Sequence, residues 1–177
     1  MTDAPPAVFN DRAGRPQLVF ERVLAHPRER VWSALSTRAE LDCWHPTPFE
    51  LEPREGARVS FAAGDGIPVM PEGHVLACEP PHLLAYTWGE DELRWELAPH
   101  EHGCLLRLTH SFDDRFKAAR DAAGWEICLR ALAGLLGGTP PAAPGEQRLP
   151  GDWRELNGEY ERRFGIAPEQ ATPPPLM

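Results

Sequence analysis

The chain has 177 residues, of which 42% are hydrophobic and 25% are charged, with a formal net charge of -9. These proportions are ordinary for one folded domain with a sizeable core. The negative charge and the lack of a long basic run argue against nucleic acid and against an anionic membrane surface, because both are bound mainly through Lys and Arg. No apolar stretch reaches the ~20 residues of a spanning helix.

The amino end has no apolar core of the kind that a secretory signal requires, so we expect a cytoplasmic protein. Prolines and glycines interrupt residues 1–16, which we expect to form a flexible arm. Residues 18–24 are rich in Val, Phe and Leu and are predicted to form a strand, although their weak alternation leaves open which face is buried.

Two short helices are predicted after this strand. Pro27 suits the first position of a helix, because that position needs no backbone N–H donor. The helix is supported by apolar side chains at helical spacing: Val31, Trp32 and Leu35. Thr37 with Glu40 fits a capping box that begins the second helix, which ends near Trp44 before a proline-rich stretch.

From Phe49 the apolar period changes to two residues, which is typical of strands. We expect strands at 49–53, 57–62, 73–79, 83–88, 92–98 and 104–111. Short turns between adjacent strands predict an antiparallel meander. The longer connection over 63–72 is rich in Gly and Pro and is the best candidate for a mobile loop at the rim of a site.

A long helix is predicted over 114–137, where apolar side chains return at a helical period: Trp125, Cys128, Leu129, Leu132, Leu135 and Leu136. A Pro/Gly linker and an additional helix over 153–164 follow. We therefore divide the chain into the arm, a main domain over 17–138, the linker with its helix over 139–165, and a disordered tail over 166–177.

The order of these elements resembles the START-like (SRPBCC) superfamily and, within it, the family named after the activator of the heat-shock-protein-90 ATPase. Two segments carry the resemblance: the run from Pro27 to Trp44, and Gly124-Trp125-Glu126-Ile127-Cys128-Leu129-Arg130-Ala131-Leu132. The resemblance implies an α+β helix-grip fold, in which a curved antiparallel sheet wraps around a long C-terminal helix and two short helices follow the first strand.

The resemblance also implies a cavity between the sheet and the long helix. Alternation along the strands nominates the residues that face it. The candidate ligand-binding residues are Trp44, Phe61, His74, Tyr86, Trp88, Trp95, His110, Trp125 and Leu129. An aromatic interior with a few polar tips suits a flat or greasy small molecule. The alternative is that these aromatic residues are plain core.

Motifs for catalysis or metal binding are weak. His100-Glu101-His102 lies where a hairpin turn is predicted, its neighbours point apart, and no third ligand is evident. His74 and His110 share parity with the inner face and could serve as acid or base, or could be satisfied structural histidines. His45 follows Trp44 at the end of the second helix, where it could line the mouth of the cavity, but we favour a position in a surface loop. The sequence also contains no nucleophile elbow. From these observations together we predict no metal, no cofactor and no catalytic residue.

Three functions remain open. The first is non-catalytic binding of a hydrophobic small molecule in the cavity. The second is an enzyme of the polyketide cyclase or aromatase type, which would require two titratable groups near one ligand atom. The third, implied by the family resemblance, is a co-chaperone-like stress-response protein that regulates an ATPase of the heat-shock-protein-90 type. No nucleic-acid or membrane partner is expected, and a homodimer is compatible with the sequence.

Overall fold

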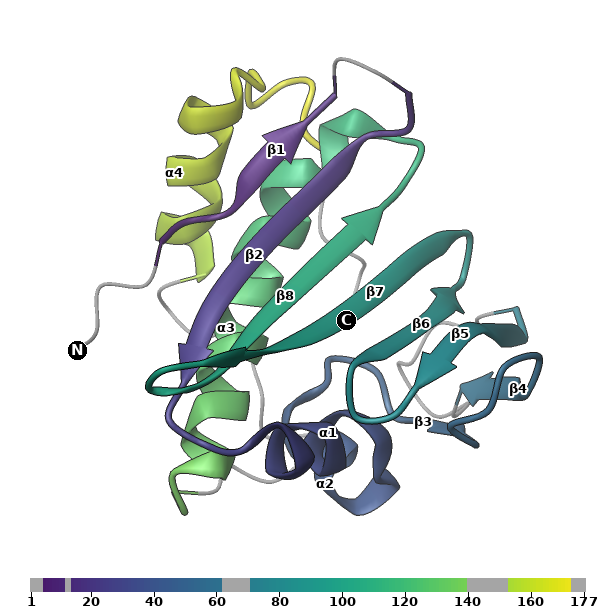
Figure 1. The fold of residues 1–177 in the computed structure, drawn as a ribbon. Coiled ribbons are helices and arrows are strands. Elements are labelled where there is room, and N and C mark those ends of the chain that lie inside the picture. Colours follow the sequence, from purple (N-terminus) through teal and green to yellow (C-terminus); the bar gives the residue numbers. More distant parts are fainter. Residues whose placement is uncertain (1–4, 12–13, 62–70, 140–152, 173–177) are drawn as a thin grey trace.

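The computed structural model describes residues 5–11, 14–61, 71–139 and 153–172 (Figure 1). Its centre is an eight-stranded antiparallel sheet with the order β1-β2-β8-β7-β6-β5-β4-β3. The strands are β1 (Val8–Asn10), β2 (Gln17–Leu24), β3 (Phe49–Leu51), β4 (Arg58–Phe61), β5 (Gly73–Glu79), β6 (Leu83–Trp88), β7 (Asp91–His100) and β8 (Gly103–Ser111).

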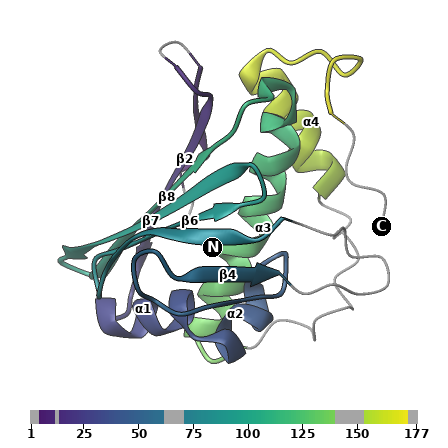
Figure 2. The same ribbon diagram turned by 90° about the vertical axis from the view of Figure 1, so that its right-hand side faces the viewer.

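The helices cover one face and one end of this sheet. They are α1 (Arg28–Ser36), α2 (Arg38–Trp44), the short 3-10 helix η1 (Arg115–Lys117), α3 (Ala118–Leu136) and α4 (Trp153–Phe164). Figure 2 shows α3 running across the concave face, with α1 and α2 at one end and α4 on the outer side of α3. This arrangement is the predicted helix-grip fold. Within the described ranges, no helix is both long and apolar enough to cross a membrane.

The inner face of β2 is now defined. Leu18, Phe20 and Leu24 are buried, whereas Val23 is half exposed. Burial of these apolar side chains against α3 is the main driving force that holds the sheet and the helix together. The open question of parity along this strand is therefore settled in favour of the Phe20 side.

The expected inward orientation of His74 is wrong. Its side chain is exposed, whereas the adjacent Val75 is buried. The pairing of β5 with β6 is irregular between Val75 and Ala77, so an extra residue, Leu76, shifts the alternation along the strand. The prediction assumed a regular strand, in which His74 would share a face with Cys78.

The predicted capping box at α2 is also wrong. Thr37 occupies the N-cap position but makes no side-chain hydrogen bond to the helix. The carboxylate of Glu40 turns instead toward α1, where it accepts hydrogen bonds from Arg30 and, at 2.7 Å, from the hydroxyl of Ser33. These side-chain hydrogen bonds connect α1 with α2.

Parts of the expected arm and tail are ordered. Val8–Asn10 pairs with β2, so this portion is a strand and not a flexible arm. In the predicted tail, Ile166 is buried, and the hydroxyl of Thr172 donates to Asp114 at 2.6 Å. Residues 1–4, 12–13, 62–70, 140–152 and 173–177 lie outside the described residues. They include most of the predicted rim loop, most of the predicted linker and the end of the predicted tail.

The helix predicted over 153–164 corresponds to α4, and a mostly buried polar network joins it to the rest of the fold. Glu126 of α3 accepts hydrogen bonds from Arg22 at 2.8 Å and from the hydroxyl of Tyr160 at 2.7 Å. The backbone N–H of Ala7 donates to the same hydroxyl at 3.0 Å. The network therefore ties α4, α3, β2 and the segment before β1 to one carboxylate.

Candidate functional site

A continuous group of aromatic rings lies between the sheet and α3. Neighbouring ring centroids are 4.6 to 6.1 Å apart, and most pairs meet edge to face or at a tilt, which aromatic rings prefer. We call this group the aromatic cluster. Its members are Trp44, His45, Phe49, Phe61, Tyr86, Trp88, Trp95, His110 and Trp125.

Local structure explains why these rings converge. Leu84, Tyr86 and Trp88 alternate along β6, so their side chains point to the same face of the sheet. Trp95 of β7 pairs with Leu84 of β6 and therefore shares this inner face. Trp44 ends α2, and its indole N–H donates to the carbonyl of Ala34 at 2.9 Å, which fixes the ring against the cluster. Trp125 approaches from the buried face of α3.

Seven of the nine nominated residues are brought together: Trp44, Phe61, Tyr86, Trp88, Trp95, His110 and Trp125. Leu129 is buried one turn along α3 from Trp125, and His74 lies on the opposite face of the sheet. Most of the cluster is buried, but Trp88 and Phe61 are partly exposed. A ligand-binding role for these residues stays a prediction.

His45 belongs to the cluster, so its expected place in a surface loop is wrong. Only 6% of its surface is exposed. The indole N–H of Trp95 donates to the Tyr86 hydroxyl at 3.4 Å, and that hydroxyl lies 3.3 Å from Nε2 of His45. Nδ1 of His45 lies 2.9 Å from the carbonyl oxygen of Thr47. The backbone N–H of Thr47 also lies 3.2 Å from Nδ1, so His45 uses both ring nitrogens whichever of them carries the proton.

Burial keeps this chain of polar groups neutral. It lowers the pKa of His45 from an ordinary 6.5 to about 3. Burial likewise raises the pKa of Tyr86, against a smaller effect of the Trp95 hydrogen bond. At neutral pH His45 is therefore an uncharged imidazole and Tyr86 an intact phenol.

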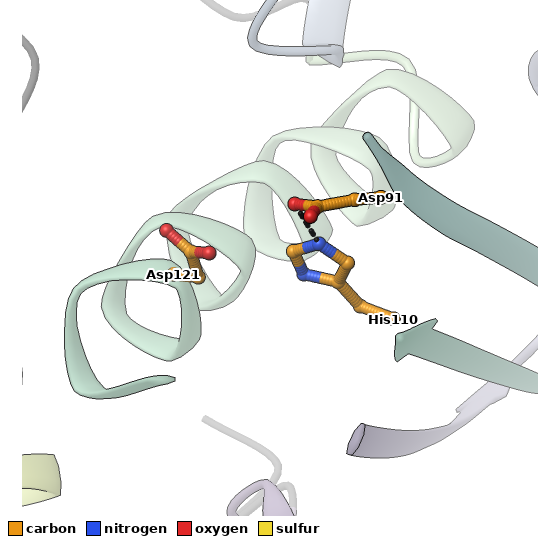
Figure 3. Close-up of side chains that lie close together, drawn as sticks. All are labelled: Asp91, His110 and Asp121. Carbon is orange, nitrogen blue, oxygen red and sulfur yellow. Dashed lines mark hydrogen bonds and ion pairs between the residues drawn. The ribbon is translucent and has the colours of Figure 1, made fainter. Parts of the chain in front are cut away.

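A second polar group surrounds His110 (Figure 3). The indole N–H of Trp125 donates to Nδ1 of His110 at 3.1 Å, so Nδ1 must carry the lone pair. Nε2–H then donates to Oδ2 of Asp91 at 2.8 Å. Both ring nitrogens of His110 therefore have hydrogen-bond partners within the protein.

Asp91 is the first residue of β7 and lies one residue before the strand predicted over 92–98. It is 8% exposed and accepts from both His110 and the ammonium of Lys117. Burial alone would raise the pKa of Asp91, but these two partners outweigh it and hold the pKa below its usual value. Asp91 has the same parity as Leu93 and Trp95, so the alternation itself could have placed it inward.

The residues Asp91, His110 and Asp121 could be taken for a metal site, because one ligand atom from each lies within 4.8 Å of the others. The Lys117 ammonium, however, lies 2.5 Å from Asp91 and 3.9 Å from Asp121. It supplies the positive charge between the two carboxylates. Nε2 of His110 also carries a proton in the tautomer deduced above, so these residues fit an ion-pair network better than a metal centre.

The family described as "Activator of Hsp90 ATPase homolog 1-like protein" matches residues 25–137. The chain belongs to this family. The matched segment begins before α1 and ends after α3, and it contains every member of the aromatic cluster. A search of curated proteins found no match.

Solved structures with the same fold include a conserved protein of unknown function from Enterococcus faecalis, which is 20% identical with a TM-score of 0.71 over 90% of each chain. CalU16 from Micromonospora echinospora is 20% identical with a TM-score of 0.69, over 90% of this chain and 94% of that chain. MLL2253 from Mesorhizobium loti is 29% identical with a TM-score of 0.62, over 70% and 98%. At such identities the likeness describes the fold.

Proposed function

We propose that the protein binds a hydrophobic small molecule at the aromatic cluster and does so without catalysing a reaction on it. The observation that carries this proposal is the continuity of the cluster from its buried centre to two partly exposed rings, Trp88 and Phe61. An apolar ligand would exchange water for aromatic surface at these rings.

The polar groups of the cluster favour binding over proton chemistry. A general acid or base needs a pKa near the working pH and a free position toward the ligand. The pKa of His45 is about 3, which makes it a poor base at neutral pH, and its Nε2 is engaged by Tyr86. His110 uses both nitrogens on Trp125 and Asp91. These features argue against a cyclase-like reaction.

Thermal unfolding in the presence of flavonoids, polyketides, fatty acids and sterols tests the proposal. A ligand at 100 times its dissociation constant should add ~2.7 kcal/mol to the free energy of unfolding. Trp88→Ala should abolish that gain while the variant still folds. Trp153→Phe, on α4 and outside the cluster, is the matched control and should retain it.

A panel that produces no stabilisation would contradict the proposal. The aromatic cluster would then be a filled core, and the search would turn to protein partners. Retention of the full stabilisation in Trp88→Ala would also contradict it, because the ligand would then bind elsewhere.

A further inference from the structure

The aromatic cluster contains one buried donor that has no hydrogen-bond partner among the described residues, the indole Nε1–H of Trp88. Its ring lies between the two polar groups, with centroids 5.9 Å from His45, 5.7 Å from His110 and 5.6 Å from Trp125. A buried N–H without an acceptor has lost its hydrogen bond to water and gained none in return, which is unfavourable. The atom therefore marks a position where an acceptor would be strongly favoured.

No side chain among the described neighbours accepts from this N–H. His45 uses its two ring nitrogens on Tyr86 and Thr47, and His110 uses its two on Trp125 and Asp91. The other indole donors in the cluster are satisfied: Trp44 by Ala34, Trp95 by Tyr86 and Trp125 by His110. Trp88 is the exception within an otherwise closed hydrogen-bond network.

The charges next to Trp88 are also balanced. Asp91 and Asp121 carry two negative charges, and Lys117 and Arg120 lie within ion-pair distance of them with two positive charges. Because His45 is uncharged and Lys117 and Arg120 are paired with these carboxylates, the members of the cluster within the described ranges give an entering carboxylate no positive charge to offset its desolvation. The electrostatics therefore disfavour an anionic ligand.

We propose that the ligand is a neutral aromatic molecule bearing an acceptor oxygen, such as a ketone, which accepts a hydrogen bond from Nε1–H of Trp88. This inference rests on the proposed function and adds the chemical class of the ligand. It separates the candidates that an apolar site alone would not distinguish: neutral aromatic ketones are favoured over hydrocarbons without an acceptor and over carboxylates such as fatty acids.

Three tricyclic probes of nearly equal shape test the inference: 9-fluorenone, which has the acceptor; fluorene, which lacks it; and fluorene-9-carboxylate, which is anionic. Their dissociation constants are measured by titration with the wild-type chain and with Trp88→Phe, which keeps an aromatic ring but removes the donor. Trp153→Phe serves again as the control.

The wild-type chain should bind 9-fluorenone about tenfold more tightly than fluorene, a ratio that corresponds to ~1.4 kcal/mol. The carboxylate should bind about tenfold more weakly than fluorene, or not measurably. In Trp88→Phe the preference for the ketone over the hydrocarbon should fall to about twofold or less, while fluorene binding changes little. The control should keep the tenfold preference.

The two proposals fail in different ways. If ketone and hydrocarbon bind with equal affinity, or if Trp88→Phe keeps the preference for the ketone, the inference about Trp88 is overturned while the proposed function stands. If none of the probes and no member of the wider panel binds, the proposed function itself fails. Should Trp88→Phe not fold, the ketone-to-hydrocarbon ratio of the wild-type chain still decides the question of ligand class.

Discussion

Lowering the pH from 7 to 5 should destabilise the fold through His45. Its pKa is 6.5 when free and about 3 when buried beside Tyr86, so the unfolded chain takes up a proton over this range and the folded chain does not. The stability that comes from burying the neutral ring is complete above pH ~6.5 and is lost as the pH falls toward the folded pKa. Between pH 7 and 5 the loss is ~2 kcal/mol, at ~1.36 kcal/mol per pKa unit.

The assay is urea denaturation at pH 7, 6 and 5 for the wild-type chain, His45→Gln and His74→Gln. The difference in free energy of unfolding between wild type and His45→Gln should shrink by ~2 kcal/mol from pH 7 to pH 5, since glutamine does not titrate. His74→Gln removes an exposed imidazole and should follow the wild-type curve. Parallel curves for wild type and His45→Gln would refute the argument, because His45 would then titrate alike in both states.

Three further variants test the packing by chemical denaturation. Asp91→Asn removes the carboxylate that the buried His110 and the partly buried Lys117 share, and it should cost about 3–5 kcal/mol. The exposed neighbour Glu92→Gln should cost less than ~1 kcal/mol, and equal costs would contradict the network around Asp91. Gly124→Ala should stabilise α3 by up to ~1 kcal/mol, because its added methyl meets nothing within 4 Å. Gly73→Ala should instead destabilise by about 1–3 kcal/mol, because its methyl would lie 2.6 Å from the carbonyl oxygen of Thr87; a stability equal to wild type would show that the strands move apart freely.

Alternation was sufficient to predict most of the inner face. Tyr86 and Trp95 lie on regular parts of β6 and β7, where successive side chains point to opposite faces, so parity alone orients them. The same reasoning failed for His74 because a one-residue irregularity in β5 shifts the parity. The local residue pattern does not predict that irregularity, because it depends on how β5 pairs with β6.

The polar members of the site were harder to predict for a different reason. His45 follows a helix and precedes a proline, a setting that is typical of exposed connections. It is buried because its ring packs in the cluster and hydrogen-bonds to Tyr86, which is far along the chain. Asp91 next to a turn also looks exposed until Lys117 and His110 are brought to it. The alternation could have placed Asp91 inward, but its partners and that of His45 are non-local, so composition and period do not identify them.

The most direct test of the central claim is the NMR signal of the Trp88 indole N–H in the wild-type chain, followed during titration with 9-fluorenone and with fluorene. We predict that the ketone moves this proton signal to higher frequency, as a new hydrogen bond does, and that the hydrocarbon does not. If both probes bind and leave the Trp88 signal unchanged, the aromatic cluster does not present this donor to a ligand, and the inferred hydrogen bond from Trp88 is contradicted.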